Sequence, residues 1–275
     1  MSNYPRTIST QKDSNYNGVF TLLGCGTSTG VPMPGCKCEV CKSKDKKNWR
    51  TRSSGLIKTK DNFTLLIDVT TDFRFQSIFN NIDRIDAVFI THAHADHILG
   101  IDDLRGYNFA QKTDIPIYAT ANTIADIRSI FSYIFKPNPN HKGSLPKLKL
   151  IEINDFIPFK IGPIEVIPFA MKHGNSSTTG IRVGDLSYAT DCNEIYKRSL
   201  DIIHGSNTLI LDGLRFEPHP THFCIPQAID VASKLDIDRT ILTHLSHTVE
   251  YNRDSKKLPN GFKLGIDGMS IGINL

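Results

Sequence analysis

The chain has 275 residues, of which 39% are hydrophobic and 22% are charged, and this balance excludes collagen-like, low-complexity and wholly disordered proteins. No uninterrupted apolar stretch approaches the roughly 20 residues of a transmembrane helix, so no membrane-spanning helix is expected. The formal net charge of +4, from 32 basic and 28 acidic side chains, is too small to predict nucleic-acid binding by itself.

The N-terminal residues are polar and lack the apolar core that a secretion signal needs. We therefore expect a flexible tail over residues 1–17, a single domain over residues 18–275 and an intracellular, cytoplasmic location. Six cysteines in such a chain indicate free thiols or metal thiolates rather than a disulfide framework.

Short apolar runs rich in Val, Ile, Phe and Thr recur along the chain and predict β-strands, with helical patterns between some of them. The strands come in clusters rather than in strict alternation with helices, which favours two stacked sheets flanked by helices. In chain order the expected strands are Val19–Leu23, Phe63–Ile67, Ala87–Thr91, Ile115–Ala119, Ile164–Met171, Ser187–Thr190, Thr208–Leu211 and Thr240–Thr243, and the expected helices are Asp72–Phe79, Ala121–Phe135, Glu194–His204 and Pro226–Leu235.

The segment THAHADHILG, residues 91–100, directly follows an expected strand and holds three histidines and an aspartate. Imidazole and carboxylate groups are the usual ligands of Zn²⁺, Mn²⁺ and Fe²⁺. His92 and His94 alternate along an extended segment and so point the same way, whereas Asp96 and His97 turn toward a second position. A cluster of surface histidines is the alternative interpretation.

Three more candidate ligands, His173, Asp191 and His244, each follow an expected strand. Strand ends gather along one edge of a layered α/β fold, so these side chains should meet the histidine segment. Together the candidates are too many for one tetrahedral ion and predict two. Asp191 is the expected bridge, because a carboxylate has two oxygens and neutral imidazole cannot bridge.

Cys36, Cys38 and Cys41 lie in GCKCEVC, and thiols this close predict a tight metal-binding loop. A strained disulfide is the alternative. A tetrahedral zinc needs a fourth ligand, for which His247 is the candidate. It follows His244 by three residues, and this odd spacing in an extended segment sends the two side chains to opposite faces.

The HAHADH motif with its downstream histidines and aspartate resembles the metallo-β-lactamase fold superfamily of binuclear hydrolases, from about Val19 to the C-terminus. The resemblance implies an α/β fold, a four-layer αββα sandwich in one domain, with metals at one edge. It also implies that Asp68, in LLIDVT, orients a ligand imidazole, an exposed turn aspartate being the alternative. By the family motif, His92, His94 and His173 would hold one ion, and Asp96, His97 and His244 the other, with Asp191 between them.

Four further segments resemble the PhnP-type phosphodiesterase branch: LGCGTSTGVPMPGCKCEVC, HILGIDDLR, HPTHF and the closing THLSH…GIDGM. This resemblance implies a Cys₃His structural zinc site, cleavage of phosphodiesters including cyclic ribose phosphates, and a homodimer in many members. His222 matches the branch's catalytic histidine and would protonate the leaving oxygen, with His219 as the alternative donor. The segment Tyr107–Pro146 differs from the branch, so the exact substrate does not transfer.

We therefore expect a binuclear metal-dependent phosphodiesterase that uses metal-bound hydroxide against a small phosphodiester, such as a cyclic nucleotide or cyclic ribose phosphate. The expected cofactors are two divalent ions, Mn²⁺ or Zn²⁺, and one structural Zn²⁺. The expected catalytic residues are Asp191 and His222. Neither a membrane nor a polynucleotide is an expected partner.

Three alternatives stay open. A thioester or lactone hydrolase of the same fold would use identical metal ligands. A nuclease acting on RNA or DNA ends would use the basic run Lys42–Arg52, with Trp49 among its cations, although a solvated basic face is the simpler interpretation. A non-catalytic zinc protein would be expected to have closed, mostly thiolate shells.

Overall fold

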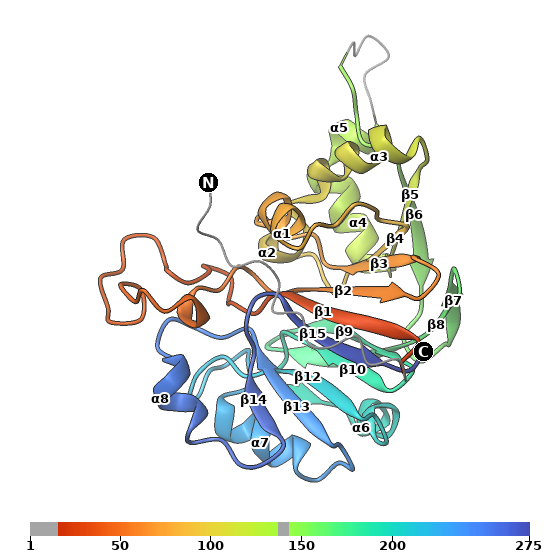
Figure 1. The fold of residues 1–275 in the computed structure, drawn as a ribbon. Helices are drawn as coiled ribbons and strands as arrows, with labels where there is room; N and C mark the ends of the chain where they lie inside the picture. Colours follow the sequence, from red (N-terminus) through yellow and green to blue (C-terminus); the bar gives the residue numbers. More distant parts are fainter. Residues whose placement is uncertain (1–15, 137–142) are drawn as a thin grey trace.

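Two β-sheets face each other, and helices cover the outer face of each sheet, so that four layers lie in the order helix, sheet, sheet, helix (Figure 1). The computed structural model describes residues 16–136 and 143–275. The expected αββα sandwich is confirmed. The tail expected over residues 1–17 lies almost wholly outside the described residues. Within the described part of the chain, no helix has the length and apolar character needed to cross a membrane.

The sheets differ in strand order, and each combines antiparallel and parallel pairs. The first sheet has the order β15 (Met269–Ile273), β1 (Gly18–Gly24), β2 (Ser54–Thr59), β3 (Thr64–Ile67), β4 (Ala87–Phe89), β5 (Ile115–Thr120) and β6 (Leu148–Ile153). The second has the order β11 (Glu194–Ile195), β8 (Ile164–His173), β9 (Ser176–Val183), β10 (Leu186–Ala189), β12 (Thr208–Asp212), β13 (Arg239–Thr243) and β14 (Phe262–Leu264), with β7 (Phe159–Ile161) paired to β8.

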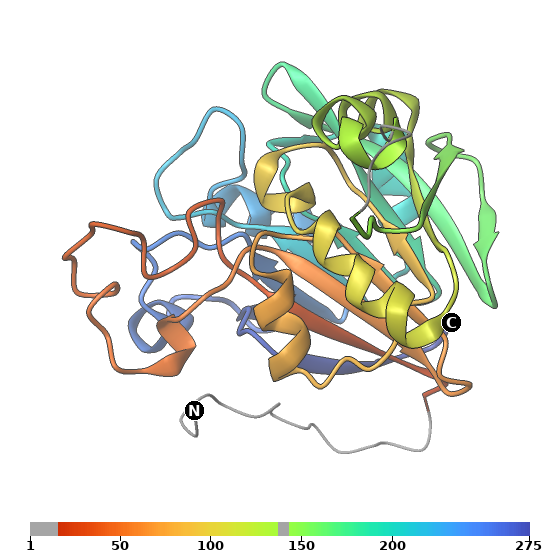
Figure 2. The same cartoon turned by 90° about the horizontal axis from the view of Figure 1, so that it is seen from above.

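The helices are short and divide between the two outer layers. Seen from above, the helices of the first outer layer lie across the first sheet, and a long loop projects from one side of the sandwich (Figure 2). The first layer holds α1 (Phe73–Phe79), α2 (Ala95–Ile98), η2 (Ile101–Leu104), α3 (Arg105–Gln111), α4 (Ala121–Ile130) and α5 (Ser132–Phe135). The others are α6 (Lys197–Ile203), α7 (Ile225–Ala232) and α8 (Tyr251–Ser255), with η1 (Lys46–Asn48) in the projecting loop.

The first sheet is buried on both faces, and this produces two apolar cores. Along β3, Leu65 and Ile67 join the core between the sheets, which also holds Phe169 and Tyr188, whereas Leu66 joins the core beneath the helices. The split follows from the alternation of side chains along a strand. Each fully buried Leu or Ile side chain stabilises the fold by about 1.5–3 kcal/mol, so both interfaces hold the first sheet in place.

Parallel pairing brings several strand ends to one edge of the sandwich. Strands β3, β4, β5 and β6 pair in parallel in the first sheet, as do β10, β12, β13 and β14 in the second. The carboxyl ends of parallel strands meet at the same edge of their sheet. The loops after β3, β4, β10, β12 and β13 are therefore placed to build a site together.

The eight expected strands are present with their ends shifted by at most two residues, but two expected helices are wrong in part. The helix expected at 121–135 is broken at Phe131 (φ −101°, ψ 39°) into α4 and α5. The helix expected at 194–204 begins as strand β11, because Glu194 pairs with Lys172 on β8, and only Lys197 onward is helical.

Candidate metal centre and active site

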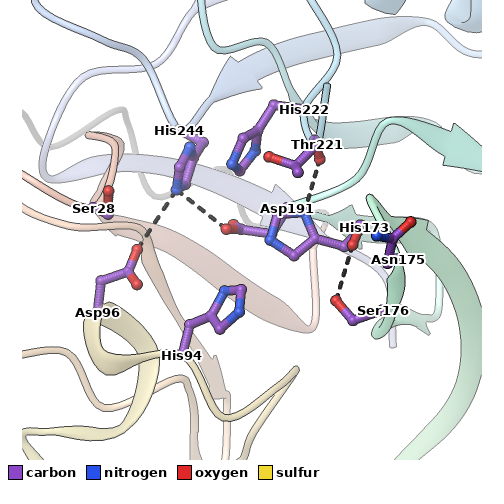
Figure 3. A pocket seen from close by; sticks show the side chains of 10 residues that line it. All are labelled: Ser28, His94, Asp96, His173, Asn175, Ser176, Asp191, Thr221, His222 and His244. Atoms are coloured by element: carbon purple, nitrogen blue, oxygen red, sulfur yellow. Dashed lines mark hydrogen bonds and ion pairs between the residues drawn. The ribbon is translucent and has the colours of Figure 1, made fainter. Parts of the chain in front are cut away.

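A cavity of about 450 Å³ opens at the edge where the strand ends meet (Figure 3). Both sheets contribute to its wall, and most of its lining side chains are histidines or aspartates. The lining residues are Ser28, His94, Asp96, His173, Asn175, Ser176, Asp191, Thr221, His222 and His244.

Three side chains of the candidate site sit on a left-handed backbone just after a strand. Asp68 follows β3 with φ 60°, Asp191 follows β10 with φ 55°, and His244 follows β13 with φ 57°. Non-glycine residues rarely adopt this conformation, which costs about 1–3 kcal/mol and persists only where the surroundings enforce it. Each strand therefore ends in an abrupt turn at the residue that the site uses.

His92, His94 and His173 form the first group of candidate ligands, with their ligand nitrogens within 4.8 Å of one another. His173 donates from Nδ1 to the Thr221 carbonyl at 2.7 Å. Nδ1 of His92 lies 3.0 Å from Thr91 Oγ1, whose own proton goes to the Asp68 carboxylate. Both imidazoles therefore keep Nε2 free for a ligand.

Burial favours the neutral form of two histidines of the first group, His92 and His173. Burial, followed by the nearby His97, lowers the pKa of His92 well below its usual range. Burial likewise lowers the pKa of His173. Neutral imidazole is the form that coordinates a metal ion.

Asp96, His97, Asp191 and His244 form the second group, again with ligand atoms within 4.8 Å of one another. His97 donates from Nδ1 to Asp68 Oδ2 at 2.7 Å, which directs its Nε2 toward the group. His244 Nε2 lies 3.2 Å from Asp191 Oδ2 and 3.6 Å from Asp96 Oδ2.

Asp191 lies between the two groups, where a bridging ligand was expected. Its carboxylate oxygens are 3.9 Å from Nε2 of His92 in the first group and 3.4 Å from Nε2 of His97 in the second. Although burial raises it, the charges of His244 and His97 hold the pKa of Asp191 well below its usual range. Asp191 is thus held as a carboxylate within reach of both groups.

Unsatisfied nitrogens support the fit of these residues to metal ions. Nε2 of His92, Nε2 of His97 and both ring nitrogens of His244 are buried without a hydrogen-bond partner among the described residues. Buried polar atoms in proteins nearly always have a hydrogen-bond partner. Several unpaired histidine nitrogens close together therefore indicate a ligand that accepts nitrogen lone pairs. A divalent cation meets that requirement.

The position of Asp68 agrees with the orienting role that the resemblance implies, and not with an exposed turn. It is fully buried, and besides His97 it accepts hydrogen bonds from the backbone N–H and the hydroxyl of Thr91. Asp68 thereby holds Thr91 and His97, at the two ends of the segment that carries the histidines.

His222, the expected proton donor, faces the same cavity and is oriented by a carboxylate that sequence reasoning missed. Its Nδ1 donates to Asp212 Oδ2 at 2.7 Å, and its ring stacks on His244 with centroids 4.4 Å apart. Asp212 ends β12, so the strand-end signal that selected Asp191 would also have found it. His219, the alternative donor, is not among the lining residues that the structure describes.

The remaining lining side chains, also missed from the sequence, are neutral. Ser28 comes from the loop after β1, Asn175 from the turn between β8 and β9, Ser176 from the start of β9, and Thr221 from the loop after β12. Among the described residues no lysine or arginine lines the cavity. An anionic substrate would therefore depend on bound cations for charge neutralisation.

The cysteine cluster forms a second candidate metal site in the projecting loop. Cys36, Cys38, Cys41 and His247 have their ligand atoms within 4.8 Å of one another, and His247 Nδ1 lies 3.3 Å from the Cys36 sulfur. The backbone N–H of Cys41, followed by His247 and Cys36, lowers the pKa of Cys38 to about 6, which favours a thiolate. All six cysteines are described, and none forms a disulfide.

Comparison with known proteins gives one family model and several relatives. A model described as a beta-lactamase superfamily domain matches residues 64–245. A crystal structure described as a new diphosphatase from the PhnP family superposes with a TM-score of 0.87, is 34% identical and covers 94% of this chain and 98% of its own.

Two relatives of known name are similar in sequence. The octanoyltransferase of Porphyromonas gingivalis (strain ATCC BAA-308 / W83) is 38% identical over 250 residues, which cover 90% of this chain and 50% of that protein. The exodeoxyribonuclease YycJ of Bacillus anthracis is 24% identical over 163 residues, 55% of each protein. The chain thus spans about half the length of these relatives.

We expect Cys38→Ala to lower the zinc content of reconstituted protein by one ion per chain while the ions at the cavity stay bound, because the two candidate sites share no residue. Metal analysis by mass spectrometry checks this. Cys224→Ser, a change at a buried cysteine outside the cluster, is the matched control and should keep every ion. Unchanged zinc in the Cys38 variant would contradict the assignment.

Proposed function

Because the chain belongs to the β-lactamase superfamily and, within it, to the PhnP family, we propose that it is a metal-dependent hydrolase that cleaves small phosphodiesters. The observation that carries the proposal is the meeting of three features at one cavity. Two groups of histidines and aspartates share Asp191, and His222, anchored on Asp212, faces the same space.

The two groups are proposed to hold the catalytic ions. His92, His94 and His173 would bind one ion, and Asp96, His97 and His244 the other, with Asp191 contacting both. Two divalent ions, Mn²⁺ or Zn²⁺, would supply Lewis acidity and lower the pKa of bound water toward about 7. Asp68 and the Thr221 carbonyl keep His97 and His173 turned toward these positions.

His222 is proposed to act as the general acid. Because its Nδ1 hydrogen is held by Asp212, its Nε2 is the atom available to the cavity. A proton on Nε2 would pass to the departing oxygen of the diester, while the Asp212 carboxylate holds the ring in this orientation. Such a positioned acid typically contributes about 10²–10⁴-fold to the rate.

The size of the cavity supports a small substrate. Its volume is about 450 Å³, within the range of small-molecule sites. The neutral side chains of Ser28, Asn175, Ser176 and Thr221 suit hydroxyl groups on the substituents of the phosphate, as in a cyclic nucleotide or cyclic ribose phosphate.

The two named relatives suggest other activities. Transfer of an acyl group commonly uses a cysteine or lysine nucleophile, and none of the described lining residues is either. The match also covers only half of the octanoyltransferase, so we do not propose acyl transfer. Hydrolysis of nucleic-acid ends, suggested by the exodeoxyribonuclease, is the second candidate, favoured by the exposed Lys42, Lys44, Lys46 and Lys47 of the projecting loop.

We expect His222→Ala to keep its metal content and to lose about 10²–10⁴-fold in kcat on a diester with an alkyl leaving group. The loss should be much smaller with a p-nitrophenyl leaving group, since that oxygen departs without a proton. His204→Ala, at an exposed histidine, is the matched control. Equal losses on both esters would show that His222 does not act as the acid.

Asp212→Asn should show the same dependence on leaving group with a smaller loss, because a neutral amide is a weaker acceptor for the Nδ1–H group and holds the ring of His222 less firmly. Parallel kinetics on the two esters measure this. A variant as active as the wild type on the alkyl ester would remove Asp212 from the proposed mechanism.

The substrate class is tested with Mn²⁺- or Zn²⁺-reconstituted protein on an alkyl phosphodiester, a thioester, a lactone and a single-stranded oligonucleotide. Metal-dependent turnover of the diester, with little on the thioester or lactone, is the expected result. Preference for the oligonucleotide, with KM rising steeply with salt, would favour the nuclease instead.

A further inference from the structure

The closing GIDGM motif contains a carboxylate that the proposed reaction does not use. Asp267 lies in the turn between β14 and β15, at the far end of the chain from the loop that carries the thiols. We call that loop, residues 26–50, the thiolate lobe; Figure 1 shows it as the red to orange loop beside α8.

Both ends of the thiolate lobe are bonded to this one carboxylate. Asp267 Oδ1 accepts a hydrogen bond from the backbone N–H of Cys25 at 3.0 Å, and the Cys25 thiol lies 3.3 Å from the same oxygen. Asp267 Oδ2 accepts from the backbone N–H and the hydroxyl of Thr51, each at 2.7 Å. Cys25 and Thr51 are the residues that directly flank the lobe, so the carboxylate closes its base.

The base of the lobe is bonded in turn to the chain that carries His244. Leu245, the next residue, donates its N–H to the Cys25 carbonyl at 2.8 Å and accepts from the Thr27 N–H at 3.1 Å. One residue further along the lobe, Ser28 lines the cavity. The same two backbone hydrogen bonds thus hold Ser28 in the cavity wall and the backbone next to His244.

The other end of the lobe is also hydrogen-bonded to the segment that follows His244. Arg50 is 2% exposed, and its guanidinium donates to the carbonyls of Ser246 at 3.0 Å and Val249 at 2.9 Å. His247, the histidine of the thiolate site, lies between these two carbonyls. The segment 244–249 therefore contributes to both candidate metal sites while bonded to both ends of the lobe.

We propose that Asp267 is a positioning residue that clamps the two ends of the thiolate lobe and thereby couples the thiolate site to the cavity wall and to His244. The clamp rests on contacts alone and does not depend on the proposed reaction. Burial raises the pKa of Asp267 to about 6, and the four hydrogen bonds that its carboxylate accepts act in the opposite direction. These hydrogen bonds therefore offset part of the cost of burying the ionised carboxylate.

Asp267→Asn tests the clamp with almost no change in shape. The carboxylate accepts from the backbone N–H of Cys25 on one oxygen and from the backbone N–H of Thr51 on the other. An amide has a single accepting oxygen, so whichever way it is turned, one of these two N–H groups loses its acceptor and the clamp is broken at that end. Asp185→Asn is the matched control, because Asp185 accepts from the N–H and the side-chain amide of Asn274, each at 2.9 Å, and none of its hydrogen bonds among the described residues reaches the lobe.

Hydrogen–deuterium exchange of the metal-loaded full chain is the decisive measurement. In the Asp267 variant we expect exchange to be at least tenfold faster in peptides covering residues 26–52 and 244–250, and unchanged in β8 and β9. The Asp185 variant should leave the lobe peptides as in the wild type. Unchanged exchange in the lobe, or a uniform increase along the chain, would overturn the clamp.

A second variant and a kinetic readout separate the clamp from general loss of structure. Thr51→Val replaces the hydroxyl, which also accepts from Gln76 Nε2 at 2.9 Å, with a methyl group. It keeps the backbone N–H bond to Asp267, so a smaller increase in exchange in the same peptides is expected. If the protein hydrolyses the diester, KM should rise more than kcat falls in Asp267→Asn, because Ser28 shifts before the metal ligands do. If it has no diesterase activity, the exchange result still decides the clamp.

Discussion

The parallel direction of the central strands is the constraint on which the site depends. In each sheet these strands open their carboxyl ends toward the same edge, so histidines and aspartates placed just after β4, β10 and β13 come together there. His92 and His244 come from different sheets, and their Nε2 atoms lie 3.9 and 3.2 Å from Asp191 Oδ2. Asp191 can lie between the two groups because β10 stands at the centre of the second sheet.

Three histidines of the candidate site are oriented in the same way, each by a hydrogen bond from Nδ1 to a protein oxygen. His97 donates to Asp68, His222 to Asp212 and His173 to the Thr221 carbonyl, in each case from Nδ1. The tautomer is thereby fixed and Nε2 is presented inward. With no lysine or arginine among the described lining residues, the charge available to an anion is set by whatever cations these nitrogens hold.

The fold class and the gathering of candidate ligands were predictable because both depend on local pattern: apolar runs, and His or Asp at their ends. The position of Asp212 at the end of β12 was a usable signal, but its role as the acceptor for His222 comes from a bond that only the folded loop creates. Strand β9 was missed because SSTTGIRV has no apolar run and is held by its pairing with β8. The role of Asp267 rests on contacts with Cys25, 242 residues away, which no local pattern encodes.

At the left-handed turns of Asp68, Asp191 and His244, the residue that would be most stable on the backbone differs from the residue that the candidate site requires. Glycine or asparagine would relieve the backbone strain at these positions while removing a carboxylate or an imidazole. A laboratory selection for heat resistance alone, run without metal, would thus tend to accumulate changes at the residues that the site needs most. Variants from such a selection would be stable proteins that lack candidate metal ligands. Their mutated positions would identify the site through its effect on stability and not through its activity.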